Sequence, residues 1–235
     1  MSIAAIRILL GPVLLWQGKQ VRRTILRLPE AEGPRTGQSG SGAPLSVLLL
    51  GDSSVAGVGA DTQTDALSGR LIDRLSTTHH VTWRVIAKTG WTTRDANNAL
   101  ADMTTEAFDV VVLSLGVNDV TTETGLKPWL TLYHDLLNAL QQTCQPKLIV
   151  VSGLPPMGRF PALSQPLRWY LGKQAKAHET ALFATLSNKP GTATLPLTFD
   201  LEVSAMARDG FHPGPAVYDA WAADIAACIQ SHISA

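Results

Sequence analysis

Three side chains in this sequence could together carry out nucleophilic catalysis. Ser53 lies in the run GDSS (residues 51–54), and Asp209 and His212 stand three residues apart in DGFHP (residues 209–213). A serine hydroxyl is a poor nucleophile at neutral pH and needs an adjacent base. An imidazole becomes that base when a carboxylate holds its Nδ1–H, so one loop could supply both groups. Taken alone, GDSS is also an ordinary strand-to-helix turn, and His212 could simply cap the last helix.

Two further residues could stabilise negative charge on an oxygen atom. Asn118, in GVND (residues 116–119), offers a side-chain amide, and Gly90 offers an unobstructed backbone N–H. Both groups are suitable donors to an oxyanion. Asn118 could equally be a turn residue, and Gly90 a loop glycine. The glycine-rich run that continues to Gly59 has no GK[ST] ending, which argues against nucleotide binding, and GDSS is no G-x-S-x-G elbow of an α/β-hydrolase.

Runs of strand length and of helix length alternate from residue 45 onward. The apolar runs predict strands at 45–50, 81–87, 108–115, 147–152 and 193–197. Amphipathic stretches predict helices over about 65–76, 93–103, 128–141, 166–186 and 214–233. This alternation favours right-handed crossovers, and therefore a flavodoxin-like three-layer α/β/α sandwich with a five-stranded parallel sheet. Ligands of such sheets bind outside the carboxyl ends of the strands, where all four polar clusters fall.

The composition fits one sizeable domain. The chain has 235 residues, of which 45% are hydrophobic, enough to bury a core without metals or disulfides. Lys and Arg number 19 and so do Asp and Glu, so the net charge is zero and we expect no nucleic-acid partner. Cys144 and Cys228 lie far apart in no metal-binding spacing. We therefore expect no disulfide scaffold and no metal site.

Two segments precede a catalytic domain that we expect at residues 45–235. Residues 1–28 contain a short apolar run and five basic residues with no acid. The run is too short to span a membrane, but the composition suits a helix in peripheral contact with anionic lipid. The alternative is a helix that packs on its own domain or on a partner. Residues 29–44 are rich in Gly, Pro and Ser and predict a linker. With no secretory signal pattern, we expect a cytoplasmic or membrane-associated protein rather than a secreted one.

The four polar clusters together resemble the signature blocks of the SGNH hydrolases, also called the GDSL esterase/lipase family. GDS at Ser53, the block with Gly90, GxND through Asn118 and DxxHP through His212 occur here in order. The resemblance covers about residue 45 to the C-terminus and implies the three-layer fold and ester hydrolysis without metal or cofactor. It implies that Ser53 attacks the acyl carbonyl, His212 transfers the proton and Asp209 orients the imidazole. The implied oxyanion donors are the backbone N–H groups of Ser53 and Gly90 and the amide of Asn118.

Three polar neighbours of these blocks receive other roles. By sequence alone Ser54 competes with Ser53 as nucleophile, but it stands one place beyond the serine of the family block. Asp52 and Asp119 are expected to tie loops together rather than to react.

The substrate class is predicted from one loop. Within the family, substrates range over acyl-CoA thioesters, lysophospholipids, aryl and short alkyl esters, and acetylated sugars. Met157, Phe160 and Leu163, in the loop after the fourth predicted strand, suit an acyl chain better than a hydrated sugar, although they could merely pin the loop. We expect a serine esterase for small-molecule esters with short to medium acyl chains, of the arylesterase/lysophospholipase type. The alternatives are a carbohydrate acetylesterase and a membrane- or partner-binding protein with a vestigial hydrolase site.

Overall fold

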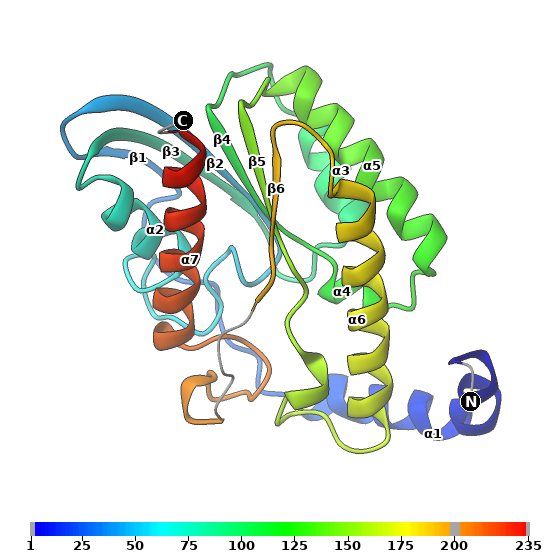
Figure 1. Ribbon diagram of the computed structural model, residues 1–235. Coiled ribbons are helices and arrows are strands. Elements are labelled where there is room, and N and C mark those ends of the chain that lie inside the picture. Colours follow the sequence, from blue (N-terminus) through cyan, green and yellow to red (C-terminus); the bar gives the residue numbers. More distant parts are fainter. Residues whose placement is uncertain (1–2, 198–202, 234–235) are drawn as a thin grey trace.

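Six strands form a single, mostly parallel sheet (Figure 1). The computed structural model describes residues 3–197 and 203–233. Along the sheet the strands follow the order β1-β3-β2-β4-β5-β6; only β1 runs antiparallel to its neighbour. Their bounds are β1 Thr36–Ser39, β2 Ala43–Gly51, β3 His79–Ala87, β4 Val110–Ser114, β5 Leu148–Ser152 and β6 Thr192–Leu195. The predicted fold class is confirmed, with one strand more than the five expected.

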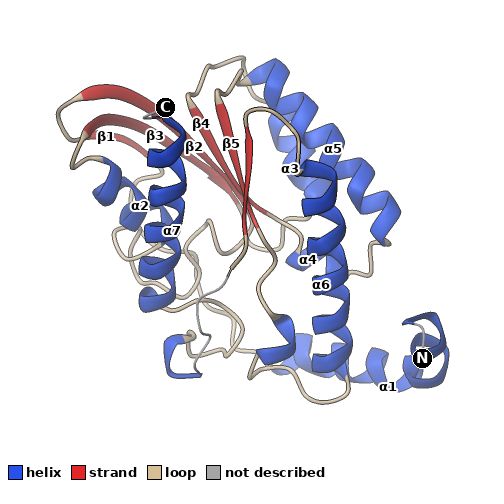
Figure 2. Cartoon of the chain, viewed as in Figure 1, coloured by secondary structure: helices blue, strands red, loops and turns tan. Residues whose placement is uncertain are grey.

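Helices cover both faces of the sheet (Figure 2). One face carries α2 (Leu67–Leu75) and α7 (Pro215–Ile233), and the other carries α3 (Thr93–Ala101), α5 (Leu126–Thr143) and α6 (Leu167–Leu186). Short pieces complete the chain: α4 (Val117–Thr121) and two 3₁₀ turns, Met157–Arg159 and Val203–Ala205. In β2, Val47 and Leu49 pack toward α2 and α7, while Leu48 and Leu50 pack toward the opposite helices. Burial on both faces explains why this strand is apolar without alternation.

The strand order reverses direction between β2 and β4. From β2 the chain first adds β3 on one side and then β4 on the other, which is the switch point of a flavodoxin-like sheet. The two strands end side by side at Gly51 and Ser114. A Cβ at Gly51 would lie 2.6 Å from the Ser114 carbonyl oxygen, so only glycine fits there. The loop that follows β2 therefore begins at the switch point, directly beside the end of β4.

Residues 29–44 differ from the predicted linker because they bind the edge of the sheet. Residues 36–39 form β1 and pair with residues 81–84 of β3. The Glu30 carboxylate accepts hydrogen bonds from the backbone N–H and the hydroxyl of Thr89, and it forms an ion pair with Arg35 at 2.6 Å. Ala31 is buried. These contacts come from distant segments, which is why local composition did not predict them.

The N-terminal helix α1 (Ile3–Thr24) lies across the end of the molecule at which α6 begins (Figure 1). Leu14 is buried. Gln17 donates a hydrogen bond to the Gln165 carbonyl at 2.7 Å and accepts one from the Leu167 backbone N–H at 3.0 Å. Gln17 thus satisfies a donor that the first turn of α6 would otherwise leave unpaired. Among the described residues, no helix has the length and hydropathy needed to cross a membrane.

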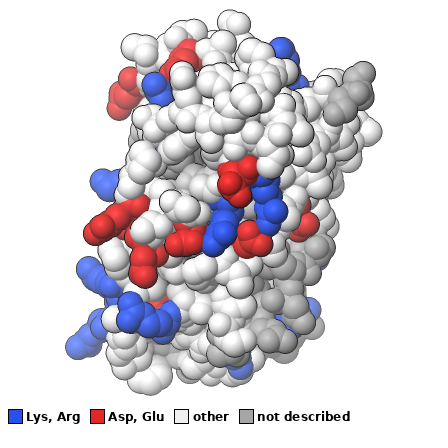
Figure 3. Space-filling model, turned by 90° about the vertical axis from the view of Figure 1, so that its left-hand side faces the viewer, with Lys and Arg blue, Asp and Glu red and all other residues white. Residues whose placement is uncertain are grey.

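Acidic and basic side chains lie next to one another on the face shown in Figure 3. Arg70 of α2 pairs with Asp65 at 2.7 Å, and Arg74 pairs with Asp219 of α7 at 2.8 Å. Because the two signs are interspersed, this face offers no one-sign field of the kind that attracts a polyanion.

Candidate active site

Ser53 lies in a tight loop that follows β2 at the switch point. The loop folds back on itself, because the Ala56 N–H donates to the Asp52 carbonyl and the Val58 N–H donates to the Ser53 carbonyl, both at 2.9 Å. Ser53 remains 8% exposed. The loop therefore holds the serine hydroxyl at the carboxyl edge of the sheet, as the sequence predicts.

His212 reaches Ser53 from the loop that precedes α7. Its Nε2 lies 3.0 Å from the Ser53 Oγ, and its Nδ1 lies 2.5 Å from the Asp209 Oδ2. The other carboxylate oxygen of Asp209 accepts the backbone N–H groups of Phe211 and His212 at 2.9 and 3.0 Å. An aspartate that accepts from the backbone two and three residues on is typical of a tight turn. One carboxylate oxygen of Asp209 thus stabilises the turn, and the other holds the imidazole of His212 in its orientation.

The environment of Asp209 favours its charged form. Burial acts to raise the pKa of this carboxyl, but the hydrogen bonds from the His212 ring and from the two backbone amides, with the charge of His212, outweigh it. The net effect is a pKa below the usual range. Hydrogen bonds to a carboxylate stabilise the ionised state, so Asp209 is a fixed negative charge beneath the imidazole.

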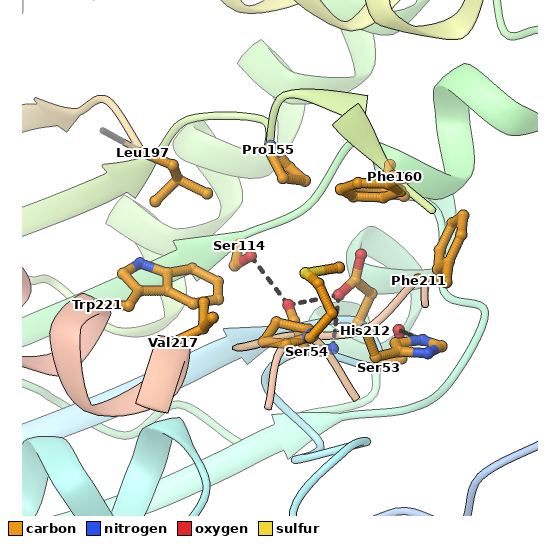
Figure 4. Close-up of a pocket in the computed structure, with 14 residues that line it drawn as sticks. Ser53, Ser54, Ser114, Pro155, Phe160, Leu197, Phe211, His212, Val217 and Trp221 are labelled. Atoms are coloured by element: carbon orange, nitrogen blue, oxygen red, sulfur yellow. Dashed lines mark hydrogen bonds between the residues drawn. The ribbon is translucent and has the colours of Figure 1, made fainter. Parts of the chain in front are cut away.

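Ser54 points away from His212 (Figure 4). Its hydroxyl donates to the Asp52 Oδ1 at 2.8 Å and lies 3.2 Å from the hydroxyl of Ser114. Of the two adjacent serines, only Ser53 therefore has the imidazole within hydrogen-bond distance.

The three candidate oxyanion donors differ in whether they already have a hydrogen-bond partner. Among the described residues, neither the Ser53 nor the Gly90 backbone N–H has a hydrogen-bond acceptor. Gly90 has φ +86°, a backbone conformation that favours glycine. The Asn118 side-chain amide donates to the Trp91 carbonyl at 2.9 Å and, at the longer distance of 3.5 Å, to the Asp52 Oδ2. The second of these contacts is weak by its length, so its proton is available to a better acceptor.

Asp52 and Asp119 hold loops, as the sequence predicts. Asp119 accepts the backbone N–H and the hydroxyl of Thr93, both at 3.0 Å, at the start of α3. Asp52 accepts the corresponding groups of Ser54. Burial raises the pKa of both carboxyls in spite of these hydrogen bonds. Neither has His212 as a hydrogen-bond partner, so the imidazole is left to Asp209.

An apolar cavity of about 50 Å³ adjoins the Ser53 hydroxyl (Figure 4). Leu197, Val217 and Trp221 lie on one side of it, with Phe160 and Phe211 on the other. The last two rings are 5.0 Å apart in an edge-to-face arrangement. The cavity can take a small apolar group next to the Ser53 hydroxyl.

The three residues predicted to bind substrate have different positions. Phe160 lines the cavity at Ser53, whereas Leu163 lines a larger groove beside α1. Met157 is fully buried and lines neither, so it pins its loop to the core. Phe211, Val217 and Trp221 were not predicted; Phe211 could have been found from its place inside the DGFHP block, whereas the other two carry no signal beyond helical spacing in α7.

Binding of a metal ion would need several ligating side chains close together in the described part of the chain. Within residues 3–197 and 203–233, no group of three or more His, Cys, Asp and Glu side chains could hold a metal ion. The arrangement of the described side chains suits a nucleophilic serine, a base and an oxyanion site.

Comparisons with known proteins identify a matching family model and several similar folds. A family model described as "GDSL-like Lipase/Acylhydrolase family" matches residues 49–220. The sequence matches no curated protein. Among solved structures, a lipase from a goat rumen metagenome superposes with a TM-score of 0.61 at 17% identity, covering 78% of this chain and 96% of that one. A family two carbohydrate esterase from Clostridium thermocellum gives 0.62 at 15% identity, with 83% and 67% covered. The esterase EstA from Pseudoalteromonas gives 0.58 at 16% identity, with 81% and 99% covered.

Proposed function

The chain belongs to the GDSL-like lipase/acylhydrolase family of ester hydrolases, and on this premise we propose that it is a serine esterase that acts through Ser53, His212 and Asp209. The observation that carries the proposal is the unbroken chain of contacts from the Ser53 Oγ through both nitrogens of His212 to the Asp209 carboxylate, at 3.0 and 2.5 Å. Such an arrangement activates an otherwise weak nucleophile.

Acylation begins when the Ser53 Oγ attacks the carbonyl carbon of the ester. The hydroxyl proton passes to the His212 Nε2, and the negative charge of Asp209 stabilises the imidazolium that forms. The carbonyl oxygen becomes an oxyanion, which accepts from the Ser53 and Gly90 N–H groups and from the Asn118 amide. The C–O bond to the alcohol then breaks, and His212 returns its proton to the departing oxygen.

Deacylation repeats these steps with water as the nucleophile. His212 takes a proton from the water as its oxygen attacks the acyl carbon, and the same donors stabilise the second oxyanion. Collapse of the intermediate releases the carboxylic acid, and the proton on His212 returns to the Ser53 oxygen. Each proton thus moves through one imidazole, and no metal or cofactor takes part.

The lining of the site supports esters with apolar acyl groups. The cavity at Ser53 has aromatic and aliphatic walls from Phe160, Phe211 and Val217, which favour short acyl groups over hydrated sugar rings. We therefore assign small-molecule carboxylic esters of the arylesterase or lysophospholipase type. A carbohydrate acetylesterase is the second candidate, because the cavity has room for an acetyl group and a carbohydrate esterase is among the similar structures.

The outward face of α1 supports peripheral contact with anionic lipid as a further part of the proposal. Leu9, Val13 and Trp16 are 67%, 44% and 64% exposed, and their spacing places them on one side of the helix. Arg23 continues that side and is also exposed. An exposed apolar strip with adjacent cations is typical of helices that lie at a lipid surface.

The test of the enzymatic proposal is an acyl-length series of p-nitrophenyl esters, run beside lysophospholipid and acetylated xylan, with EDTA present and absent. We expect hydrolysis of the aryl esters at a rate that chelation leaves unchanged, and covalent labelling of Ser53 by a fluorophosphonate. Activity on acetylated xylan alone would select the second candidate. No hydrolysis and no labelling would reject both.

A further inference from the structure

A groove of about 460 Å³ separates part of α1 from the body of the protein. Leu15, Gly18 and Ile25 lie on the α1 side, and Leu167 and Leu171 of α6 lie on the other. Pockets that bind apolar small molecules have volumes of roughly 300–1,000 Å³ and mostly hydrophobic walls. Lys19, Arg22 and Glu123 also line the groove. In size, and over the apolar part of its lining, the groove is suited to an apolar ligand.

The groove and the cavity at Ser53 share a wall. Phe211 lines both, and its ring lies 5.3 Å from the ring of His212. Asn118, the proposed side-chain donor to the oxyanion, also lines the groove. The groove therefore adjoins the cavity at Phe211 and reaches the residue proposed as side-chain donor to the oxyanion.

The volumes of the cavity and of the groove determine how long an acyl chain each of them can hold. The cavity at Ser53 is about 50 Å³, far below the size of ordinary ligand pockets, whereas the groove is about 460 Å³. The cavity alone holds only a short acyl group. A longer apolar chain needs the groove.

The α1 wall is fixed in position by contacts at several points. Besides Leu14 and Gln17, the Arg22 Nη2 donates to the Thr121 carbonyl at the end of α4, at 2.9 Å. α4 also carries Asn118. Residues 3–24 lie outside the family match, which begins at residue 49, so this wall is an addition to the part of the chain that the family shares.

A glycine keeps the groove open at the centre of that wall. Leu14, Gly18, Val21 and Ile25 follow the i, i+4, i+7, i+11 spacing of one helix face, and all four line the groove. A Cβ at Gly18 would have no atom within 4 Å. Space that a larger side chain would fill is thus left free next to α6.

We infer that the groove between α1 and α6 binds the acyl chain of longer esters, so that α1 sets the acyl-length range of the enzyme. The inference rests on the proposed esterase function and adds the substrate class that the groove selects. Chains too long for the cavity at Ser53 pass Phe211 and lie along Gly18. Acetyl and other short acyl groups react without entering the groove.

The first test fills the groove in the full-length protein. Gly18→Leu introduces a side chain into open space and improves the helix propensity of α1, so we expect it to fold. With p-nitrophenyl esters below their aggregation concentration, we expect kcat/KM for the decanoate to fall about 10- to 100-fold, the range for a changed apolar pocket, with acetate within about twofold. Gln20→Leu places the same side chain at an exposed position outside the groove and should change neither.

The second test changes the chemistry of the groove instead of its volume. Leu15 lines the groove and is 61% exposed, so Leu15→Asp introduces a charge there without disturbing the core. We expect a selective loss on the decanoate through KM. Leu26→Asp is the matched control, because Leu26 is 53% exposed and does not line the groove.

The outcomes separate this inference from the proposed function. If neither ester is hydrolysed and Ser53 is not labelled, the esterase proposal fails. If the wild type hydrolyses both esters and Gly18→Leu keeps the same decanoate-to-acetate ratio, the esterase proposal stands and the role of the groove is wrong. Equal effects of Leu15→Asp and Leu26→Asp would also overturn it.

Discussion

Gly59 lies in the loop after β2 that carries Ser53, and it packs directly against Pro213 in the loop before α7 that carries His212. A Cβ at Gly59 would come within 2.1 Å of the Pro213 carbonyl oxygen, and Gly59 has φ +103°. The hydroxyl of Tyr218 in α7 adds a second link, because it donates to the Val58 carbonyl at 2.7 Å. The two segments that carry Ser53 and His212 are therefore in backbone contact, and a side chain at this position would push them apart.

Gly59→Ala should lower both activity and stability. Displacement of a catalytic group by about 1 Å costs about 10²-fold in rate, and we expect a loss of kcat of that order. Strain at positive φ adds about 1–3 kcal/mol to the free-energy cost of folding. Gly191→Ala is the control, since Gly191 also has positive φ, at +66°, but lies in the turn directly before β6. It should lower the thermal midpoint and leave kcat nearly unchanged; unchanged kcat in Gly59→Ala would mean that the loops tolerate separation.

Replacement of the two adjacent serines should separate their roles. Ser53→Ala should lower kcat by a factor on the order of 10⁶ and abolish fluorophosphonate labelling, because loss of a triad nucleophile leaves only binding and oxyanion stabilisation. Ser54→Ala removes hydrogen bonds to Asp52 and Ser114 but should keep the label. Peptide mapping of the labelled protein checks this, and a label on Ser54 would reverse the assignment.

Asn118→Ala should act mainly on kcat. Removal of one oxyanion donor typically costs about 10²–10³-fold in kcat, since the interaction is strongest in the transition state. The KM for p-nitrophenyl acetate should change little. Steady-state kinetics distinguish the cases: a change confined to KM would make Asn118 a substrate-positioning residue.

The protonation of Asp209 should not affect kcat/KM at any pH above the ordinary carboxyl range, because its pKa is lowered. The folded-state pKa of Asp209 is lowered, so its contribution to stability is complete above the ordinary pKa of about 3.9 and is lost only as the pH falls through the lower folded value. A pH profile of kcat/KM should therefore show no step from this carboxyl above its ordinary pKa. Asp209→Asn should lower kcat/KM by about 10⁴-fold at every pH in that region. Near-wild-type activity of Asp209→Asn would contradict the mechanism.

Binding to anionic vesicles should depend on the outward face of α1. Each cation near an anionic surface contributes roughly 1 kcal/mol, a term that added salt screens. We expect co-sedimentation with phosphatidylserine vesicles that weakens with salt, and that Trp16→Asp abolishes. Asn188→Asp, which adds the same charge in the exposed loop after α6, is the control. Equal binding by both variants would remove α1 from the lipid contact.

The strands of the parallel sheet were predictable because their signal is local. In β2 and β4 every position from residue 47 or 110 onward is buried or nearly so, and a continuous apolar run reports such burial directly. β1 was missed because Thr36–Ser39 is polar and mostly exposed; it is a strand only because β3 supplies its hydrogen bonds. α4 is too short for a periodic pattern to indicate it.

The polar residues of the candidate site were predictable, because the types and order of these residues suggest a single chemical arrangement. Ser53, Asp209 and His212 come together as their types and order suggest. The walls around them were harder to predict, because apolar residues serve in cores and in pockets alike. Met157 and Phe160 lie three positions apart in one loop, yet only Phe160 lines the cavity. Which of two apolar side chains reaches a cavity depends on tertiary packing that their types do not encode.

The short antiparallel strand β1 also protects the protein from self-association. β3 would otherwise be the outermost strand of the sheet, and every second one of its nine residues would offer unpaired N–H and C=O groups to any other extended chain. Only four residues of β1 cover that row, and they are polar and mostly exposed, which makes the new edge a poor template for further pairing. A recombinant fragment cut at residue 45 would lose this cover and be prone to aggregation, whereas one cut at residue 29 would keep it.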